Sequence, residues 1–228
     1  MKLGIILTPD NRSKAYIQKL VENNIILNSI LFMNDNRREK PYSEDIIKIS
    51  KKNGFDITKS VKDILIENNL TFKEFNFVDI NHPRLVEHIK NNEEGFLIFT
   101  GGGILKKEVL NSGVKFIHFH PGIVPNYRGS TCFYYSILND GNSGVTAYIM
   151  DEKLDTGDIV YQKKFNKPDH IFVDDVFDPY IRSETLVELI KKDILKKNNY
   201  KKQNPLDGET FFIIHPVLKH ISILSCMS

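Results

Sequence analysis

Short apolar runs alternate with amphipathic segments along the first hundred residues, and this alternation constrains the fold most strongly. Leu3–Leu7 and residues 95–100 are almost entirely apolar, as expected of strands buried on both faces. Between them lie segments with the 3.6-residue apolar period of helices, beginning with residues 13–23. The pattern predicts an α/β fold: a Rossmann-like, mostly parallel sheet with helices on both faces. Further strands are predicted at 25–33 and 72–78, further helices at 43–52, 60–68 and 83–91, and an exposed loop at 34–42.

The second half of the chain continues with fewer clear patterns. Lys115–His120 has the character of a short strand and is followed by a loop over residues 123–131. We expect one domain over residues 1–165 and a short C-terminal extension over residues 166–228 that packs on it. The remaining predictions are a helix at 104–110, strands beginning at 144 and at 159–162 and 211–216, a helix at 180–197 and a terminal element at 217–224.

Composition excludes several classes of protein. A length of 228 residues suffices for one well-buried core, and a net charge of +2 gives no reason to expect a nucleic-acid partner. Two cysteines, Cys132 and Cys226, cannot form a disulfide framework and suit a reducing compartment. The apolar run at the N-terminus is too short for a signal peptide, and none of the apolar stretches is long enough to span a bilayer. We therefore expect a cytoplasmic protein without a membrane partner.

The densest group of chemically useful side chains lies around the strand Lys115–His120. His118 and His120 are two residues apart, so a strand would project both imidazoles from the same face. Pro121 and Gly122 then end the strand, and the following loop carries Arg128. Open α/β sheets bind their ligands at the carboxyl ends of strands, so we expect a ligand-binding crevice here.

A glycine triplet, Gly101 to Gly103, follows the apolar run at 95–100. At a strand-to-helix junction such a turn lets main-chain N–H and C=O groups approach a ligand closely, although it can equally be a purely structural turn. It does not match the phosphate-binding loop, and the dinucleotide-binding glycine pattern does not follow the first strand.

Two segments resemble the signatures of the folate-dependent formyltransferases. Residues 118–129 read His-Phe-His-Pro-Gly-Ile-Val-Pro-Asn-Tyr-Arg-Gly, similar to the family's Asn-x-His-Pro-Ser-Leu-Leu-Pro-x-Tyr-Arg-Gly. A strand from Gly144 and the run Leu-Asp-Thr-Gly-Asp at 154–158 resemble the second signature. The chain departs from the family at His118, where the catalytic asparagine is expected.

The resemblance implies an enzyme that transfers a formyl group from 10-formyltetrahydrofolate to an amine, without a metal. It places His120 and Asp155 on the family's catalytic histidine and aspartate, with His120 as general base or acid and Asp155 as its partner. The imidazole N–H of His118 can donate to an oxyanion in place of the asparagine amide. Without the flanking motif, His120 would be read as a hydrogen-bonded core histidine.

The resemblance also suggests which residues contact the folate and the acceptor. Asp151 is more typical of a turn, but it is included among the candidate folate contacts, and Arg128 is read either as a substrate contact or as a surface arginine. The full set of candidate folate contacts is Phe99, Thr100, Gly101, Gly102, Gly103, Ile104, Leu105 and Asp151, and the candidate acceptor contacts are Pro125, Tyr127 and Arg128.

The nature of the acceptor follows from the resemblance by elimination. Residues 156–228 are too few for the rest of the domain and a tRNA-binding barrel, so we expect no nucleic-acid partner. The phosphate loop of the purine-pathway enzymes does not match residues 8–13, and the deformylases carry an extra N-terminal domain. What remains is a stand-alone transferase for a small amine, an amino sugar linked to a nucleotide and used for surface polysaccharides. The C-terminal extension is expected to form part of the acceptor pocket or a contact in a homodimer.

Two other classes of function stay open at the level of sequence. His118 and His120 could bind zinc with Asp155 as a third ligand, which would indicate a metal-dependent hydrolase. Alternatively, the chain could be a non-catalytic folate-binding module.

Overall fold

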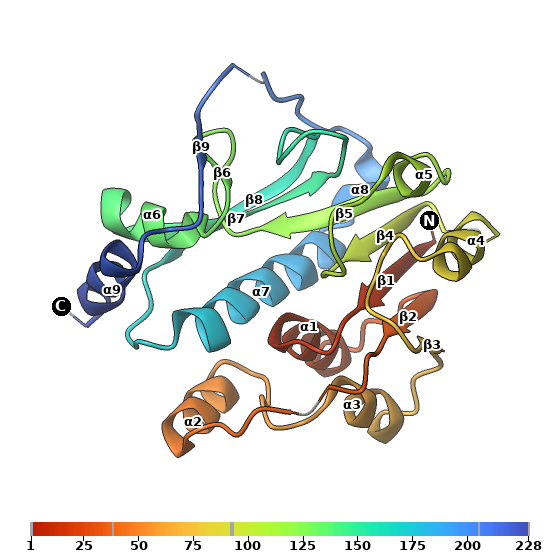
Figure 1. Ribbon diagram of the computed structural model, residues 1–228, viewed down its shortest axis with the longest axis horizontal. Helices are drawn as coiled ribbons and strands as arrows, with labels where there is room; N and C mark the ends of the chain where they lie inside the picture. The colour runs from red at the N-terminus through yellow and green to blue at the C-terminus, as the bar shows by residue number, and fades with distance from the viewer. Residues whose placement is uncertain (1, 38, 92–93, 205, 228) are drawn as a thin grey trace. The chain divides into compact units, whose positions relative to one another are not determined.

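The computed structural model describes residues 2–37, 39–91, 94–204 and 206–227. The chain forms two compact units, Met1–His118 and Phe119–Ser228. Strand β5 (Lys115–His120) begins in the first unit and ends in the second. The division predicted between residues 165 and 166 stays a prediction. Figure 1 shows the elements of both units.

The first unit is built on parallel strands. Their order is β3 (Lys73–Phe75), β2 (Ser29–Met33), β1 (Leu3–Leu7), β4 (Phe96–Phe99) and β5, and every neighbouring pair is parallel. All residues of β1 and β4 are buried, because side chains cover both faces of the central strands.

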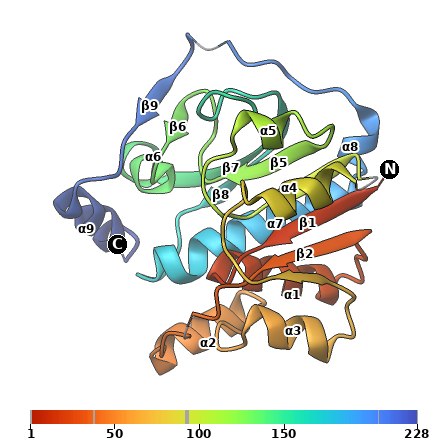
Figure 2. The same cartoon turned by 45° about the vertical axis from the view of Figure 1, so that its right-hand side comes forward.

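Helices lie on both faces of these parallel strands. The chain moves outward from β1 to β3 and then returns to β4, and right-handed crossovers require the helices of the two halves to lie on opposite faces. Accordingly α1 (Asn11–Glu22) packs beside α3 (Val61–Glu67), while α4 (Pro83–Lys90) belongs to the return connection. The remaining helices of this unit are α2 (Glu44–Lys52) and α5 (Lys107–Leu110) (Figure 2). The predicted Rossmann-like α/β fold is confirmed.

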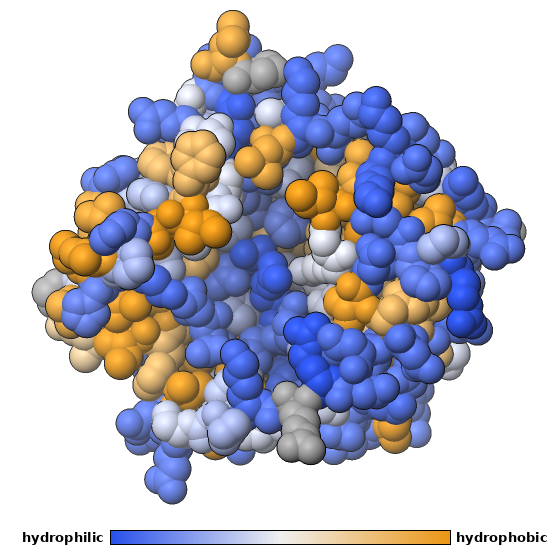
Figure 3. Space-filling view, viewed as in Figure 1, coloured by the Kyte–Doolittle hydropathy of each residue, from blue (hydrophilic) through white to orange (hydrophobic). Residues whose placement is uncertain are grey.

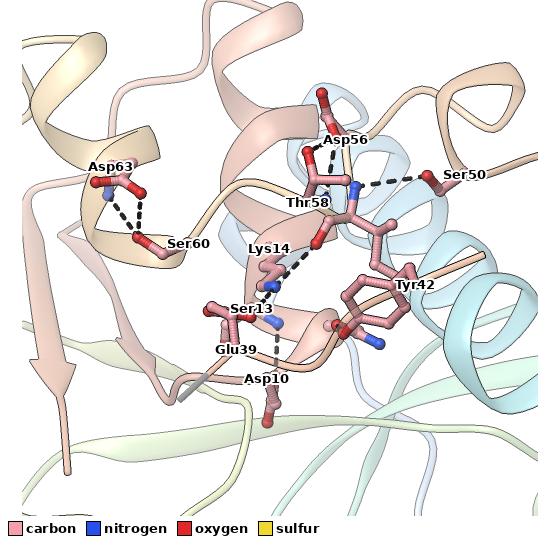
Figure 4. Close-up of polar contacts among 12 residues, drawn as sticks. Asp10, Ser13, Lys14, Glu39, Tyr42, Ser50, Asp56, Thr58, Ser60 and Asp63 are labelled. Carbon is pink, nitrogen blue, oxygen red and sulfur yellow. Dashed lines mark hydrogen bonds and ion pairs between the residues drawn. The ribbon is translucent and has the colours of Figure 1, made fainter. Parts of the chain in front are cut away.

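Polar contacts fix the start of α1 and the loop that follows β2, as Figure 4 shows. Asp10 caps α1 by accepting a hydrogen bond from the backbone N–H of Ser13 at 2.8 Å. Lys14 is 1% exposed and donates to the carbonyl of Ile57 at 2.9 Å and to the carboxylate of Glu39 at 2.6 Å. These bonds satisfy a buried ammonium group that would otherwise destabilise the fold.

The second unit combines a hairpin with packed helices. Strands β7 (Asn142–Ile149) and β8 (Ile159–Asn166) are antiparallel, and α6 (Cys132–Asp140) and α7 (Asp178–Lys191) both pack against β7. The short strands β6 (Tyr127–Gly129) and β9 (Glu209–Phe211) form a parallel pair. The other elements are a π-helical turn at Val173–Phe177, α8 (Ile194–Lys197) and α9 (Pro216–Ser225).

Helix α9 packs against α6, where the hydroxyl of Ser222 donates to the carbonyl of Tyr134 at 3.2 Å. Apolar side chains remain on the surface of α9, and an apolar group is visible at the left of Figure 3, where Figure 1 places this helix. The exposed apolar residues of α9 are Val217, Leu218, Ile221 and Leu224. Among the described residues, none of the helices combines the length and apolar character needed to cross a bilayer.

The sequence located two strands with their ends and misplaced the bounds of other elements. Leu3–Leu7 and Lys115–His120 are confirmed to the residue. The predicted helix at 180–197 is helical at both ends but not continuous, because Asp193 adopts a left-handed conformation (φ 51°) that separates α7 from α8. The predicted strand at 211–216 is wrong after Phe211, since the side chain of His215 caps α9 instead.

Several smaller boundaries also differ from the expectation. The loop predicted at 123–131 contains β6, which exists only through its pairing with the distant β9. Helix α6 was not predicted. The predicted strands at 25–33 and 72–78 shorten to β2 and β3, and the helix at 104–110 shortens to α5.

Candidate active site

The end of β5 carries a buried histidine between two oxygen atoms. His120 is 2% exposed, and its Nε2 lies 2.9 Å from the carbonyl oxygen of Tyr127. A carbonyl only accepts, so this contact assigns a proton to Nε2. The other ring nitrogen, Nδ1, lies 3.4 Å from Oδ2 of Asp155. His120 can therefore accept a second proton at Nδ1 beside a carboxylate.

Asp155 is held in place by two hydrogen bonds besides its contact with His120. It lies in the loop after β7, is 6% exposed and adopts a left-handed conformation with φ 52°. The backbone N–H of Gly129 donates to Oδ2, and the hydroxyl of Tyr148 donates to Oδ1, both at 2.7 Å. A buried carboxylate is tolerated where hydrogen bonds replace its water. Its two donors come from β6 and β7, so the fold orients the carboxylate toward the imidazole.

The turn that carries Asp155 requires glycine two residues later. A Cβ atom on Gly157 would lie 1.7 Å from the carbonyl oxygen of Ile149. The side chain of Gln203 also closes this turn, donating to the carbonyl oxygens of Asp155 at 3.1 Å and Gly157 at 2.6 Å. The Asp-Thr-Gly run thus has a packing reason as well as a chemical one.

Burial keeps His120 neutral. Loss of contact with water lowers the pKa of its imidazole, and the nearby carboxylate of Asp155 opposes this effect without cancelling it. In the same region burial raises the pKa of the Cys132 thiol to about 12, so this cysteine stays protonated at neutral pH and is not a thiolate nucleophile. The resting site therefore contains a neutral imidazole beside a carboxylate.

The loop between β5 and β6 is anchored by main-chain contacts. The hydroxyl of Thr146 donates to the carbonyl of Gly122 at 2.7 Å and accepts from the N–H of Val124 at 3.1 Å. Gln162 donates to the carbonyl of Val124 at 2.7 Å. Side chains of β7 and β8 thus fix the loop whose Tyr127 carbonyl contacts His120.

The three candidate acceptor contacts lie on or beside this loop. Arg128 is 4% exposed, so its interpretation as a surface arginine is wrong; its guanidinium donates to the carbonyls of Pro125 at 3.4 Å and Asn204 at 3.5 Å. Tyr127 is also buried, with its hydroxyl donating to Asp140 at 2.8 Å and its ring stacked on Phe211. These contacts shape the loop, and a role of Pro125, Tyr127 and Arg128 in acceptor binding stays a prediction.

His118 belongs to the first unit and is half-buried. Its Nδ1 lies 3.4 Å from the carbonyl oxygen of Phe99, and its ring is tilted against the ring of Phe99. Both contacts come from the neighbouring strand β4, with which His118 pairs in register. His118 is thus less buried than His120, two residues further along the same strand.

The predicted folate loop also lies in the first unit and continues from β4. The hydroxyl of Thr100 donates to the carbonyl of Ile6 at 2.9 Å, which ties the start of the loop to β1. Gly102 and Gly103 adopt positive φ values of 114° and 101°, and the carbonyl of Gly102 accepts from the N–H of Ile80 at 2.9 Å. Ile104 is almost fully exposed, whereas Leu105 is buried.

Asp151 behaves as a turn residue. Its carboxylate accepts from the N–H of Lys153 at 3.1 Å and from the hydroxyl of Thr156 at 3.0 Å. Its side chain is exposed, and a folate contact stays a prediction.

Comparison with known proteins identifies the family. The model of the formyl transferase family matches residues 48–175, which is more than half of the 228 residues. The chain belongs to the formyl transferase family. The resemblance of the two motifs is thereby confirmed, since both lie within the matched range.

The relatives that are similar in sequence are methionyl-tRNA formyltransferases. Methionyl-tRNA formyltransferase of Clostridioides difficile (strain 630) is 29% identical over 196 residues, which cover 84% of this chain and 59% of the relative. That of Helicobacter pylori (strain 26695) is 32% identical over 115 residues, covering 50% of this chain and 37% of the relative. The chain thus spans about three fifths of the length of the first of these relatives.

Solved structures of sugar N-formyltransferases share the fold. The enzyme from Shewanella sp. FDAARGOS_354 has a TM-score of 0.61 at 19% identity, with 100% of this chain and 89% of that chain covered. The N-formyltransferase from Helicobacter canadensis, in complex with folinic acid and dTDP-3-aminofucose, has a TM-score of 0.62 at 17% identity, covering 100% of this chain and 80% of that one.

Within this formyl transferase domain, sequence reasoning missed Tyr148 and the pair Asp178 and Arg182. Tyr148 donates to Asp155, but a tyrosine in a strand carries no signal of such a contact. Asp178 and Arg182 are four residues apart on α7, the spacing at which opposite charges meet on a helix, and this signal was available. The residues that the structure describes contain no group of three or more His, Cys, Asp or Glu side chains arranged to hold a metal ion.

Proposed function

We propose that this chain transfers a formyl group from 10-formyltetrahydrofolate to the amine of a nucleotide-linked amino sugar. The observation that carries the proposal is the buried contact between His120 and Asp155 in a chain of the formyl transferase family. A neutral imidazole beside an oriented carboxylate is suited to moving one proton during acyl transfer.

The proton balance of the reaction assigns a role to each atom of this pair. The acceptor nitrogen forms a bond to the formyl carbon, and the bond from that carbon to N10 of the folate breaks. The acceptor nitrogen loses one proton and N10 gains one. Because Nε2 of His120 already carries a proton, Nδ1 takes the proton from the acceptor nitrogen, Asp155 stabilises the resulting imidazolium, and Nδ1 then gives the proton to N10.

The oxyanion of the tetrahedral intermediate needs a donor, and we assign this role to His118. An imidazole N–H can replace the amide of the family's asparagine, with a dependence on pH that an amide lacks. His118→Asn is therefore expected to retain activity and to remove part of the pH dependence, whereas His118→Ala is expected to lose about 100-fold in kcat. Equal activities of the two variants would contradict this role.

The family and the loop from Phe99 to Leu105 support 10-formyltetrahydrofolate as the formyl donor. Gly102 and Gly103 adopt positive φ and carry no side chain that would cover their main-chain groups. Such a turn is suited to hydrogen bonding with a flat heterocycle. Folinic acid, a formylated folate, is present in the structure of the Helicobacter canadensis enzyme, which has the same fold.

Two classes of acceptor, amino sugars and methionyl-tRNA, are distinguished by a direct comparison. The sugar N-formyltransferases align over the whole of this chain, and the net charge of +2 gives little attraction for tRNA. The curated relatives, however, act on methionyl-tRNA according to their names. Both acceptors therefore belong in the test.

The experiment follows formyl transfer by mass spectrometry. Purified protein is supplied with 10-formyltetrahydrofolate and, separately, with a panel of nucleotide-linked amino sugars or with methionyl-tRNA. We expect a product heavier by one formyl group with a sugar, and a loss of about 100- to 10,000-fold in His120→Gln and Asp155→Asn. His220→Gln, a change at an exposed histidine, is the matched control. Formylation of methionyl-tRNA alone would overturn the acceptor assignment, and full activity of His120→Gln would overturn the mechanism.

A further inference from the structure

A buried arginine of helix α7, Arg182, donates a hydrogen bond to the main chain of β5, the strand that contains His118 and His120. Nη1 of Arg182 donates to the carbonyl oxygen of Phe119 at 2.6 Å, and Nε donates to Oδ1 of Asp178 at 2.7 Å. Both charged residues are buried. A buried ion pair is costly unless further hydrogen bonds complete it, and here the extra bond is to the main chain of β5.

The bonded carbonyl lies at a sensitive place. Phe119 is the residue between His118 and His120, so its carbonyl belongs to the peptide unit that leads directly into His120. Pro121 follows His120 and has no backbone N–H to help hold this end of the strand. The bond from Arg182 therefore fixes the backbone from which the imidazole of His120 reaches Asp155 and the carbonyl of Tyr127.

We infer that Arg182 is a positioning residue for His120, which it holds in place through the carbonyl of Phe119. Its charge acts in the same direction as burial and lowers the pKa of the imidazole further. This inference rests on the proposed function only for its effect on the reaction rate. The effect on the titration of His120 can be measured without any substrate.

The charges around His120 predict opposite effects for the two residues of the ion pair. Arg182 lowers the pKa of His120, and Asp178 raises it, each through its charge. Asp155, on the loop after β7, raises it as well, while Tyr148 and Cys132 are uncharged at neutral pH because burial raises the pKa of both. His118, on β5 itself, is the remaining titratable neighbour in sequence. A change in packing alone would not shift the pKa of His120 in a direction set by the sign of the charge that was removed.

The test is an NMR titration of the His120 imidazole, assigned by comparison with His120→Gln. We expect the pKa of His120 to rise in Arg182→Met and to fall in Asp178→Asn. Arg84→Met, which removes an exposed arginine, is the matched control and should leave the titration unchanged. Arg182→Lys loses the planar pair of donors but keeps the positive charge. Because the charge is kept, the titration of His120 should stay close to that of the wild type.

The same variants are then assayed for formyl transfer. We expect kcat/KM to fall by about 10- to 100-fold in Arg182→Met, because a small misplacement of a catalytic group is costly. The acidic limb of its pH profile should move to higher pH. An unchanged His120 titration in both Arg182→Met and Asp178→Asn, with thermal unfolding showing both folded, would overturn the inference. A shifted titration in a protein that forms no product would instead overturn the proposed function alone.

If Arg182→Met fails to fold, Asp178→Asn decides the question. The Asp178→Asn variant keeps the bond to Phe119 and removes only a negative charge near His120. A fall of the pKa of His120 in this variant supports the inference, and an unchanged or raised pKa contradicts it.

Discussion

The hydroxyl of Tyr148 offers a sharp test of how Asp155 is stabilised. Tyr148→Phe removes the 2.7 Å hydrogen bond to Oδ1 and leaves the ring in place. Hydrogen bonds to charged groups contribute about 1.5–3 kcal/mol. Asp155 is 6% exposed, so water cannot easily replace the lost donor, and we expect a loss in the upper part of that range, about 2–3 kcal/mol. For a chain of this length the midpoint of thermal unfolding should fall by roughly 4–12 °C.

Chemical denaturation of wild type and variant measures this loss, and Tyr161→Phe provides the matched control. The hydroxyl of Tyr161 also donates to a carboxylate, that of Glu188, at 2.6 Å. Glu188 is 27% exposed and keeps its ion pairs with Lys163 and Lys192, so this variant should lose less than about 1 kcal/mol. Equal losses in the two variants, or a loss below about 0.5 kcal/mol in Tyr148→Phe, would refute the account of Asp155.

Two further predictions concern stability. Hydrogen bonds from Lys163, Lys192 and Tyr161 lower the pKa of Glu188 from 4.5 to about 2, so its contribution is complete above about pH 4.5 and is lost as the pH falls toward 2. With allowance for solvent screening, Glu188→Gln should lose about 1 kcal/mol at pH 7 and almost nothing at pH 2; a constant difference across a pH series of urea unfolding would contradict this. Gly129→Ala should lose more than about 2 kcal/mol, because φ is 101° and the new Cβ would lie 2.1 Å from the carbonyl oxygen of Phe211. Gly113 has a similar φ of 92°, but a Cβ there would have no heavy atom of the described residues, apart from its chain neighbours, within 4 Å. A comparable loss of stability in Gly113→Ala would show that backbone strain alone, without the clash, destabilises Gly129→Ala.

The elements that the sequence predicted well are those with a strong local signal. Leu3–Leu7 and Lys115–His120 are short apolar runs ended by proline-containing turns, and both strands appear with the expected bounds. The family assignment likewise depended on two contiguous motifs. The contact of His120 with Asp155 was expected only through the resemblance, since the 34 residues between them carry no local signal for it.

What the sequence did not reveal depends on contacts between distant segments. Strands β6 and β9 have three residues each and form only because they pair with one another. The end of α7 at Lys191 depends on the backbone conformation of Asp193, which a continuing helical pattern concealed. The burial of Arg128 and the bond from Arg182 to Phe119 depend on the tertiary fold, because arginine is usually a surface residue.

The proposed function requires that this chain bind a formylated folate as its formyl donor. Calorimetric titration of 5-formyltetrahydrofolate, a stable analogue of the donor, into the wild type tests it most directly, with and without a metal chelator. We predict saturable binding that the chelator does not change and that persists in His120→Gln, because the folate contacts are assigned to the loop from Phe99 to Leu105. Absence of binding to the folded wild type, or binding that the chelator abolishes, would contradict the account.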